Sequence, residues 1–391
     1  MKRNFQTTKG MIITMVLKNA ELFDADFNLI RADLALSGNR IIKIAPDIAD
    51  DDAVDLSGCT LLPGFVDIHI HGCAGHDACD ATRDALSAMA AHLVQHGVTA
   101  FCPTTMTIAP EALTKAVMAV RDCIDEPPKG ASILGVNLEG PYISVHKKGA
   151  QMAEYVRKPD LDQFMRLFKA CGGGIKLVDI APETEDAHAF IEAVSKLCLV
   201  SLAHSEADYD EAKAAFGCGV RHATHLFNAM TGLTHRAPGA VGAVLDDERV
   251  TAELICDGQH IHPAVLRTAF KVLGDRAVVV SDSMRAAGLP DGVSELGGQK
   301  VYVKNGTARL ADGTLAGSIT NLHEELKNLI AYGIPLRQAV RAVTINPAIA
   351  VNADTEIGSL CVGKQADIVV LDSRYEIKMV LCRGICIVNK L

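Results

Sequence analysis

The chain has 391 residues, 49% of them hydrophobic, and its 47 acidic and 38 basic residues give a net charge of −9. This negative balance disfavours a nucleic-acid partner, because a phosphate backbone is bound by a basic surface. The length fits one large domain with a smaller one. No apolar run approaches the roughly 20 residues of a membrane span, so no membrane partner is expected.

The cysteines and the N-terminus indicate where the protein works. The 12 cysteines are scattered and include no C-x-x-C pair. This pattern is typical of reduced thiols and predicts a cytoplasmic location. Residues 1–10 are basic, and the apolar run after them stops at Lys18 without a small-residue cleavage site. We expect a short leader, with Met11 as an alternative start, and not a signal peptide.

Both ends of the chain carry short strand-like runs. Residues 11–62 alternate apolar runs with Asp, Asn and Gly, which is typical of a β-meander. The same texture returns in residues 353–391. We therefore expect one small β-sandwich domain built from both termini, with a different domain between them.

Residues 63–352 alternate apolar strand-like runs with helix-periodic segments. The expected strands are 65–71, 98–104, 133–139, 175–181, 198–204, 220–225, 251–256 and 277–282. Helical periodicity covers 85–96, 161–170, 187–197, 209–216 and 264–273. Strands that alternate with helices in this number predict an α/β fold of the TIM-barrel type, a (β/α)8 barrel. A doubly wound open sheet is the alternative, but no Gly-rich phosphate loop follows the first strand.

The first expected strand of the barrel ends in a His-x-His pair. Side chains alternate faces in a strand, so Asp67, His69 and His71 share one face and the apolar residues share the other. A structural buried histidine normally stands alone with one hydrogen-bond partner. The pair therefore predicts part of a metal site at the end of a strand.

Other expected strands also end in residues that bind metals or transfer protons. In a barrel the chemistry lies at the carboxyl ends of the strands. The residues at or just beyond these ends are Glu139, His204, His225, Asp257, His260 and Asp282. The remaining histidines fit less well. His222 stands three residues before His225, and on one strand it would face the opposite way.

Six motifs carry a resemblance to a known family. Residues 63–72 (PGFVDIHIHG) resemble the first-strand motif of the amidohydrolase superfamily of metal-dependent hydrolases. The branch that deacetylates N-acetylhexosamine 6-phosphates is indicated by LEGP at 138–141, AHS at 203–205, ATHLFNAM at 223–230, DGQH at 257–260 and SD at 281–282. The resemblance implies hydrolysis of the acetamide of N-acetylglucosamine 6-phosphate, in amino-sugar catabolism. The alternative is the galactosamine epimer or another N-acyl amine.

The resemblance also implies the reaction's central residues. Glu139, His204 and His225 would bind a metal, and such a set leaves a coordination position open for catalysis. Asp282 would be the general base that takes a proton from water and returns one to the departing amine. A non-catalytic sensor would be expected to lose a ligand or the base, and the chain retains all of them.

A second metal is implied by His69 and His71, with Glu139 able to bridge. The expected cofactor is therefore one or two divalent metals per subunit. Nitrogen and oxygen ligands suit zinc or iron(II), with manganese or cobalt as alternatives. A glutamate at the end of the third strand argues against the branches that use a carboxylated lysine.

The substrate residues follow from the resemblance alone. They are Ala150, Gln151, Asn228, Ala229, Arg236, His260, Leu315, Ala316, Gly317 and Ser318. Asn228 and Ala229 would hold the sugar phosphate, and Arg236 would reach it from a neighbouring subunit, which implies a homodimer or larger homo-oligomer. Residues 315–318 would cover the sugar. Gln151 stands where some members have histidine, so an acid role at this position is in doubt.

Overall fold

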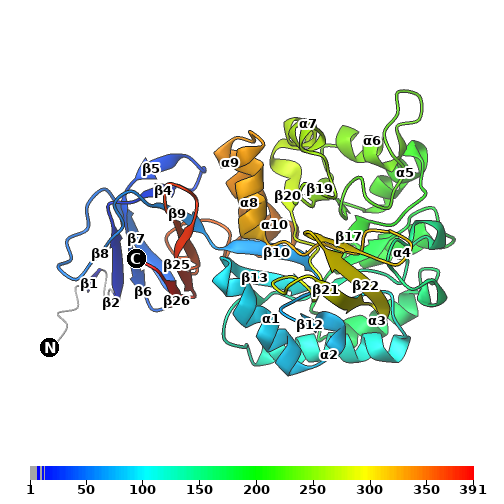
Figure 1. The fold of residues 1–391 in the computed structure, drawn as a ribbon, viewed down its shortest axis with the longest axis horizontal. Helices are drawn as coiled ribbons and strands as arrows, with labels where there is room; N and C mark the ends of the chain where they lie inside the picture. Colours follow the sequence, from blue (N-terminus) through cyan, green and yellow to red (C-terminus); the bar gives the residue numbers. More distant parts are fainter. Residues whose placement is uncertain (1–6, 9–10, 13) are drawn as a thin grey trace.

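The computed structural model describes residues 7–8, 11–12 and 14–391. The expected leader over residues 1–10 lies largely outside this range, and its described part, β1 (Thr7–Thr8), pairs with β2 (Met11–Ile12). Figure 1 shows a sheet-rich body formed by both ends of the chain, beside a larger barrel with helices around it.

Parallel strands form the barrel. They are β10 (Phe65–Ile70), β13 (Val98–Pro103), β14 (Ser132–Ile133), β15 (Val136–Leu138), β16 (Ile175–Ile180), β17 (Leu199–Leu202), β18 (His222–Ala223), β19 (Thr251–Leu254) and β20 (Ala277–Val279). Two arcs, β10-β13-β14 and β15 to β20, meet through a parallel bridge between Thr104 and Asn137. The backbone N–H of Asp282 donates to His69 O at 2.9 Å beside the other junction. The predicted (β/α)8 barrel is confirmed, with β14 and β15 sharing its third strand.

Helices surround the strands. They are α1 (Arg83–Gln95), α2 (Pro110–Asp125), α3 (Leu161–Ala170), α4 (Ala187–Val194), α5 (Tyr209–Cys218), α6 (Gly239–Asp246), α7 (Pro263–Leu273), α8 (Leu322–Ala331), α9 (Leu336–Val343) and α10 (Ile345–Ala350). Side-chain caps fix several starts, because an N-cap oxygen accepts a backbone N–H that the helix leaves free. Thr82 caps α1 and Asp160 caps α3 in this way. The expected helices are present, although α4 ends at Val194 and not at Leu197.

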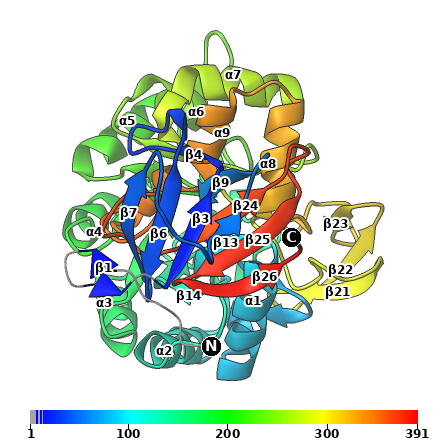
Figure 2. The ribbon, with the colours of Figure 1, turned by 90° about the vertical axis from the view of Figure 1, so that its left-hand side faces the viewer.

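Two sheets form the smaller body. The larger sheet has the order β26 (Ile385–Asn389), β25 (Ile377–Cys382), β24 (Ile368–Leu371), β9 (Thr60–Pro63), β4 (Glu21–Phe23), β5 (Leu29–Arg31). The other has the order β7 (Arg40–Ala45), β6 (Asp33–Ser37), β3 (Met15–Lys18), β8 (Val54–Asp55). Leu17 and Leu36 from one sheet share a buried cluster with Leu61, Ile368 and Leu381 from the other. Figure 2 shows strands from the N-terminal part of the chain, such as β4 and β9, beside strands from the C-terminal part, such as β24 and β25, as the predicted β-sandwich requires.

An antiparallel sheet between the eighth barrel strand and α8 was not predicted. It contains β21 (Gly292–Leu296), β22 (Gln299–Lys304) and β23 (Thr307–Arg309), and it lies beside the barrel in Figure 1. A smaller hairpin joins β11 (Gly72–Cys73) to β12 (His76–Asp77). All 12 cysteines are free. Within the described residues, no helix has the length and apolar character needed to cross a membrane.

Candidate active site and metal centre

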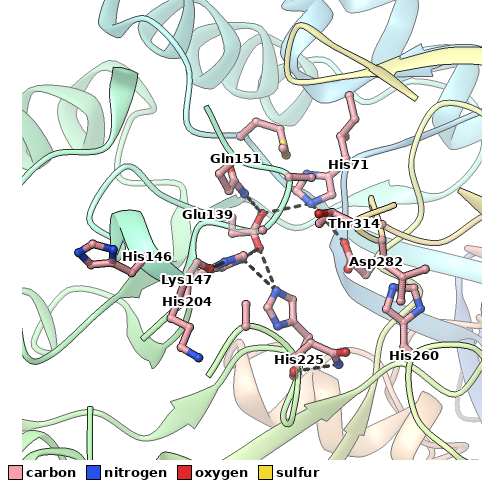
Figure 3. A pocket seen from close by; sticks show the side chains of 18 residues that line it. His71, Glu139, His146, Lys147, Gln151, His204, His225, His260, Asp282 and Thr314 are labelled. Atoms are coloured by element: carbon pink, nitrogen blue, oxygen red, sulfur yellow. Dashed lines mark hydrogen bonds and ion pairs between the residues drawn. The ribbon is translucent and has the colours of Figure 1, made fainter. Parts of the chain in front are cut away.

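A cavity of about 300 Å³ opens at the carboxyl ends of the barrel strands. Figure 3 shows histidines and carboxylates from several strands pointing toward its floor. Its walls are formed by His71, Met106, Glu139, His146, Lys147, Gly149, Ala150, Gln151, His204, His225, Asn228, Ala229, His260, Asp282, Leu296, Thr314, Leu315 and Gly317.

Glu139 is the centre of this cluster. It follows β15 and is 2% exposed. Its Oε1 lies 3.1 Å from His204 Nε2 and 3.2 Å from His225 Nε2. Its Oε2 lies 3.2 Å from His71 Nε2 and accepts a hydrogen bond from Gln151 Nε2 at 2.5 Å. One buried carboxylate therefore faces imidazoles on both sides.

His69 and Asp282 complete the floor of the cavity. His69 Nε2 lies 3.7 Å from Glu139 Oε1 and 3.5 Å from Asp282 Oδ1. His71 Nε2 lies 3.3 Å from the same Asp282 oxygen. The cluster thus contains two possible metal-binding triads that share Glu139, each with its ligand atoms within 4.8 Å of one another. One triad is His69, His71 and Glu139, and the other is Glu139, His204 and His225.

The hydrogen bonds on the far side of the rings test whether a metal fits. His204 Nδ1 lies 2.7 Å from Lys147 O, and His71 Nδ1 lies 3.2 Å from Thr104 O. A carbonyl oxygen only accepts, so each Nδ1 carries the proton. In the neutral rings, Nε2 then turns a lone pair toward the Glu139 carboxylate, and two acceptors face each other. A divalent cation between them satisfies both, so the donor set fits a metal.

The pKa values in the cluster show the same demand for positive charge. Burial alone would raise the pKa of Glu139, but the rings of His204, His225 and His71 hold it well below its ordinary value, because in their protonated form they donate to the carboxylate. Burial would lower the pKa of His71, whereas its hydrogen bonds to Asp282 and Glu139 raise it to about 10. Burial would likewise raise the pKa of Asp282, but the bond from His71 lowers it. Protons or a metal must neutralise these carboxylates.

Three of the central residues have an unusual backbone conformation. His204, His225 and Asp282 have φ angles of 43°, 33° and 45°, in the left-handed region that non-glycine residues rarely adopt. The turns are held by hydrogen bonds from Ser144 N to His204 O at 2.9 Å and from Ser318 N to Asp282 O at 2.8 Å. Backbone strain of this kind concentrates at functional sites, where the surrounding structure keeps it in place.

The structure brings most of the predicted substrate residues to the cavity wall. Those that line it are Ala150, Gln151, Asn228, Ala229, His260, Leu315 and Gly317. Ala316 and Ser318 are buried beside that wall, and Ser318 Oγ donates to Ser281 O. Both amide atoms of Gln151 are engaged, because Oε1 accepts from Thr107 N at 2.6 Å. Arg236 lies outside the lining, in an exposed loop, where it contacts its own neighbour His235.

His260 has a carboxylate partner of its own. Its Nδ1 lies 2.8 Å from Asp257 Oδ2, and the same Asp257 side chain accepts from the backbone N–H of His260. Burial alone would raise the pKa of Asp257, but these bonds lower it. The carboxylate therefore holds the ring in one orientation at the cavity wall.

Sequence reasoning missed two residues beneath the site. Glu253 accepts a hydrogen bond from His69, and His222 contacts Glu253 from the other side. Glu253 gave a signal, because it is a charged residue inside an apolar predicted strand. His222 was expected to face away from His225, but β18 ends at Ala223, so strict alternation does not extend to His225.

A comparison with known proteins finds similarity to one family and to several deacetylases of N-acetylhexosamine 6-phosphates. Residues 60–386 match the amidohydrolase family. The N-acetylglucosamine-6-phosphate deacetylase of Bacillus subtilis (strain 168) is 37% identical over 330 residues, which cover 83% of this chain and 83% of that one. The N-acetylgalactosamine-6-phosphate deacetylase of Escherichia coli O157:H7 is 35% identical, covering 83% and 86%. A mutant N-acetyl-D-glucosamine-6-phosphate deacetylase from Mycobacterium smegmatis, in complex with N-acetyl-D-glucosamine-6-phosphate, superposes with a TM-score of 0.90 at 33% identity, covering 96% and 99%.

Proposed function

The chain belongs to the amidohydrolase family, and from this we propose that it hydrolyses N-acetylglucosamine 6-phosphate to glucosamine 6-phosphate and acetate with the help of a divalent metal. The observation that carries the proposal is the buried Glu139 carboxylate, faced by imidazoles on both sides with Asp282 next to them. The similarity to the Bacillus subtilis and Mycobacterium smegmatis deacetylases supports this substrate.

The residues that would hold the metal follow from the two triads. Glu139, His204 and His225 would bind the first ion, and His69 and His71 would bind a second one together with Glu139. Zinc or iron(II) suits these ligands best, and manganese or cobalt is also compatible. When bound, such an ion supplies a Lewis acid that polarises the amide carbonyl and makes a water molecule more acidic.

Asp282 is the group that moves protons in this proposal. Burial would raise the pKa of Asp282, but the interactions with His71 and His69 lower it below the ordinary value. In the proposed reaction its carboxylate accepts a proton from water. It then returns a proton to the nitrogen of the amide, because an amine leaves poorly unless it is protonated. His71 and Ser318 keep Asp282 in place through the contacts described above.

Recognition of the sugar phosphate uses the cavity wall and a second subunit. Asn228 and Ala229 line the wall next to His225 and would hold the phosphate. Arg236, which is exposed on its own chain, would reach the phosphate of a neighbouring subunit in a homodimer or larger homo-oligomer. A planar, permanently charged guanidinium suits a phosphate. The free cysteines support a reducing, cytoplasmic location.

The second candidate substrate is N-acetylgalactosamine 6-phosphate. The Escherichia coli relative with that activity is about as similar to this chain as the glucosamine enzymes are. The two sugars differ in the orientation of one hydroxyl group. An assay with both epimers decides between them.

Acetate release from a panel of substrates tests the proposal. The panel contains both N-acetylhexosamine 6-phosphates, free N-acetylglucosamine and an N-acetyl amine that is not a sugar. We expect the highest kcat/KM with N-acetylglucosamine 6-phosphate. Charge-assisted phosphate contacts of about 1.5–3 kcal/mol each favour it over the free sugar by orders of magnitude. Comparable kcat/KM for the free sugar would show that the site does not recognise a phosphate.

A further inference from the structure

We propose that Glu253 is a positioning residue for the second metal ion. It fixes the ring of His69 so that Nε2 offers its lone pair to the site formed by His69, His71 and Glu139. The inference rests on the metal dependence proposed above, and it concerns a residue that lies beneath the cavity and does not line it.

Glu253 is fully buried, and within the described residues the hydrogen bonds of its side chain are all with histidines of this region. Its Oε2 lies 2.9 Å from His69 Nδ1 and accepts a hydrogen bond from the backbone N–H of His225 at 3.2 Å. Its Oε1 lies 3.2 Å from His222 Nε2. One carboxylate therefore contacts the ring of a residue in one triad and the backbone of a residue in the other.

The partner of His69 differs in kind from the partners of the other rings. His71 and His204 donate from Nδ1 to backbone carbonyls, at Thr104 and Lys147. Among the described residues, His225 Nδ1 has no hydrogen-bond partner. Of the four rings, within the described residues, only that of His69 has a carboxylate as the partner of Nδ1. This partner fixes the tautomer and increases the electron density on Nε2.

The hydrogen bond from His69 to Glu253 leaves Nε2 of the same ring as the atom that can bind the second metal ion. It is buried, and the part of the chain that the structure describes offers it no hydrogen-bond partner. It points to the carboxylate oxygens of Glu139 and Asp282 at 3.7 Å and 3.5 Å. These distances exceed hydrogen-bonding range but leave space for an ion coordinated from both sides. A carboxylate behind a ligating histidine typically changes metal affinity by about 10–100-fold.

Glu253→Gln removes the charge and keeps the shape. The amide oxygen can accept from His69 Nδ1 and His225 N, while the amide nitrogen faces His222. His222 can adapt, because its Nδ1 lies 2.5 Å from Thr251 Oγ1 and can donate to that hydroxyl while Nε2 accepts. The variant therefore has a hydrogen-bonding solution within the same packing, and we expect it to fold.

Asp179→Asn is the matched control. Asp179 is also fully buried under the site, but its Oδ1 accepts from the Thr224 hydroxyl at 2.7 Å and not from a ligand ring. Burial raises the pKa of Asp179 to about 8, and asparagine keeps the shape of this side chain without a group that can ionise. This variant replaces a buried carboxyl at similar depth without touching His69.

The test measures zinc binding to the metal-free chain by competition with a chromophoric chelator and counts bound ions by elemental analysis. We expect two ions in the wild type and in Asp179→Asn. In Glu253→Gln we expect the tighter ion to bind unchanged and the Kd of the second to rise about 10–100-fold. Glu253→Asp keeps the charge but withdraws it from His69, and we expect a smaller rise in the same Kd. It also replaces Glu253→Gln as the test if that variant fails to fold.

Several results would overturn the inference. Wild-type affinities for both ions in Glu253→Gln, or an equal loss at both sites, would show that Glu253 does not act on the second site. An equal loss in Asp179→Asn would assign the effect to any buried carboxyl. A wild type that binds one ion and remains active would end the inference and leave the proposed reaction intact. A wild type that is active without any metal would overturn the proposed reaction.

Discussion

The two bodies of this molecule bury very different material. The sandwich core is aliphatic, with Leu36, Leu61 and Ile368 packed between its sheets. The carboxyl end of the barrel instead buries a group of ionisable side chains within a few ångströms of one another. These are His69, His71, Glu139, His204, His225 and Asp282. The aliphatic core of the sandwich stabilises the fold. The buried ionisable cluster costs stability, and the packing of the rest of the barrel compensates for that cost.

The physical reason is the cost of burying charge. An aliphatic side chain gains free energy when it leaves water, at about 25 cal/mol per Å² of apolar surface. A carboxylate loses hydration when it is buried and must find compensation from an opposite charge. Glu139 finds it in surrounding imidazoles, and a bound cation provides the same compensation. The candidate active site therefore lies where apolar residues would give the folded chain a higher stability than the ionisable residues that are present.

Metal removal gives the largest expected effect on the barrel end. Exhaustive chelation should reduce acetate release from N-acetylglucosamine 6-phosphate to the background rate, because Glu139, His204 and His225 then hold no Lewis acid. Adding back a divalent ion should restore turnover, as measured by acetate release against metal content. Full activity in a preparation that elemental analysis shows to be metal-free would contradict the mechanism.

Asp282→Asn should lower kcat by about 10²–10⁴-fold, because an amide cannot accept the proton of water. The variant should keep its fold, since Ser318 still binds the carbonyl oxygen of residue 282. Steady-state kinetics measures the loss, and metal content with thermal unfolding serves as the control. If the variant keeps more than about a tenth of the wild-type kcat, Asp282 is not the base.

A mixed dimer tests whether a second chain completes the barrel end. Arg236→Ala should remove phosphate binding from the partner's site, and Asp282→Asn should remove the base from its own. Together they leave one intact site in each mixed dimer, so each mixed dimer formed by subunit exchange should recover up to about half of the activity of a wild-type dimer. Differently tagged subunits show that exchange has occurred. Proven exchange without recovery would mean that Arg236 does not serve a neighbouring site.

The sandwich should respond in the opposite way to the barrel end. Leu36 is fully buried, so Leu36→Ala should lower the free energy of unfolding by about 2–5 kcal/mol. The kcat of the folded enzyme should stay unchanged, because the site lies in the other body. Ile385→Ala in the same body is the control, since Ile385 is 62% exposed and its truncation should change stability by less than about 0.5 kcal/mol. A loss of kcat in Leu36→Ala would show that the two bodies are coupled.

The sequence predicted the two bodies and the central residues for physical reasons. Strand ends in a barrel meet at one edge, so His69, Glu139 and His204 could be placed together from strand positions alone. The layer beneath was harder, because Glu253 contacts His69 across 184 positions of sequence and no local pattern reports such a contact. The sheet of β21 to β23 was missed although β22 carries a signal, because Val301 and Val303 alternate with exposed residues as they do in a half-buried strand.

The smallest expected effect concerns Asp367, a buried carboxyl of the sandwich without a cluster around it. Its Oδ1 accepts from Arg383 N at 2.7 Å, whereas Oδ2 lacks a partner within residues 14–391. Burial raises its pKa to about 6 from its ordinary value of 3.8. A raised acidic pKa means that the folded state holds a proton which the unfolded chain releases. Stability is therefore lost as pH rises from about 4 to about 6, and little changes above that range.

Asp367→Asn removes this dependence, because its amide does not ionise and its oxygen can still accept from Arg383. Urea unfolding at pH 5 and pH 7.5 measures both chains. Over this interval the stability of the variant relative to the wild type should increase by about 1–2 kcal/mol. Other titrating groups are common to both chains and cancel in the difference. A constant difference between the two pH values would show that Asp367 ionises in the folded sandwich as readily as in the unfolded chain. The sandwich would then hold the buried carboxylate of Asp367 without a cluster of ionisable groups around it. The buried carboxylates of the barrel end lie within such a cluster.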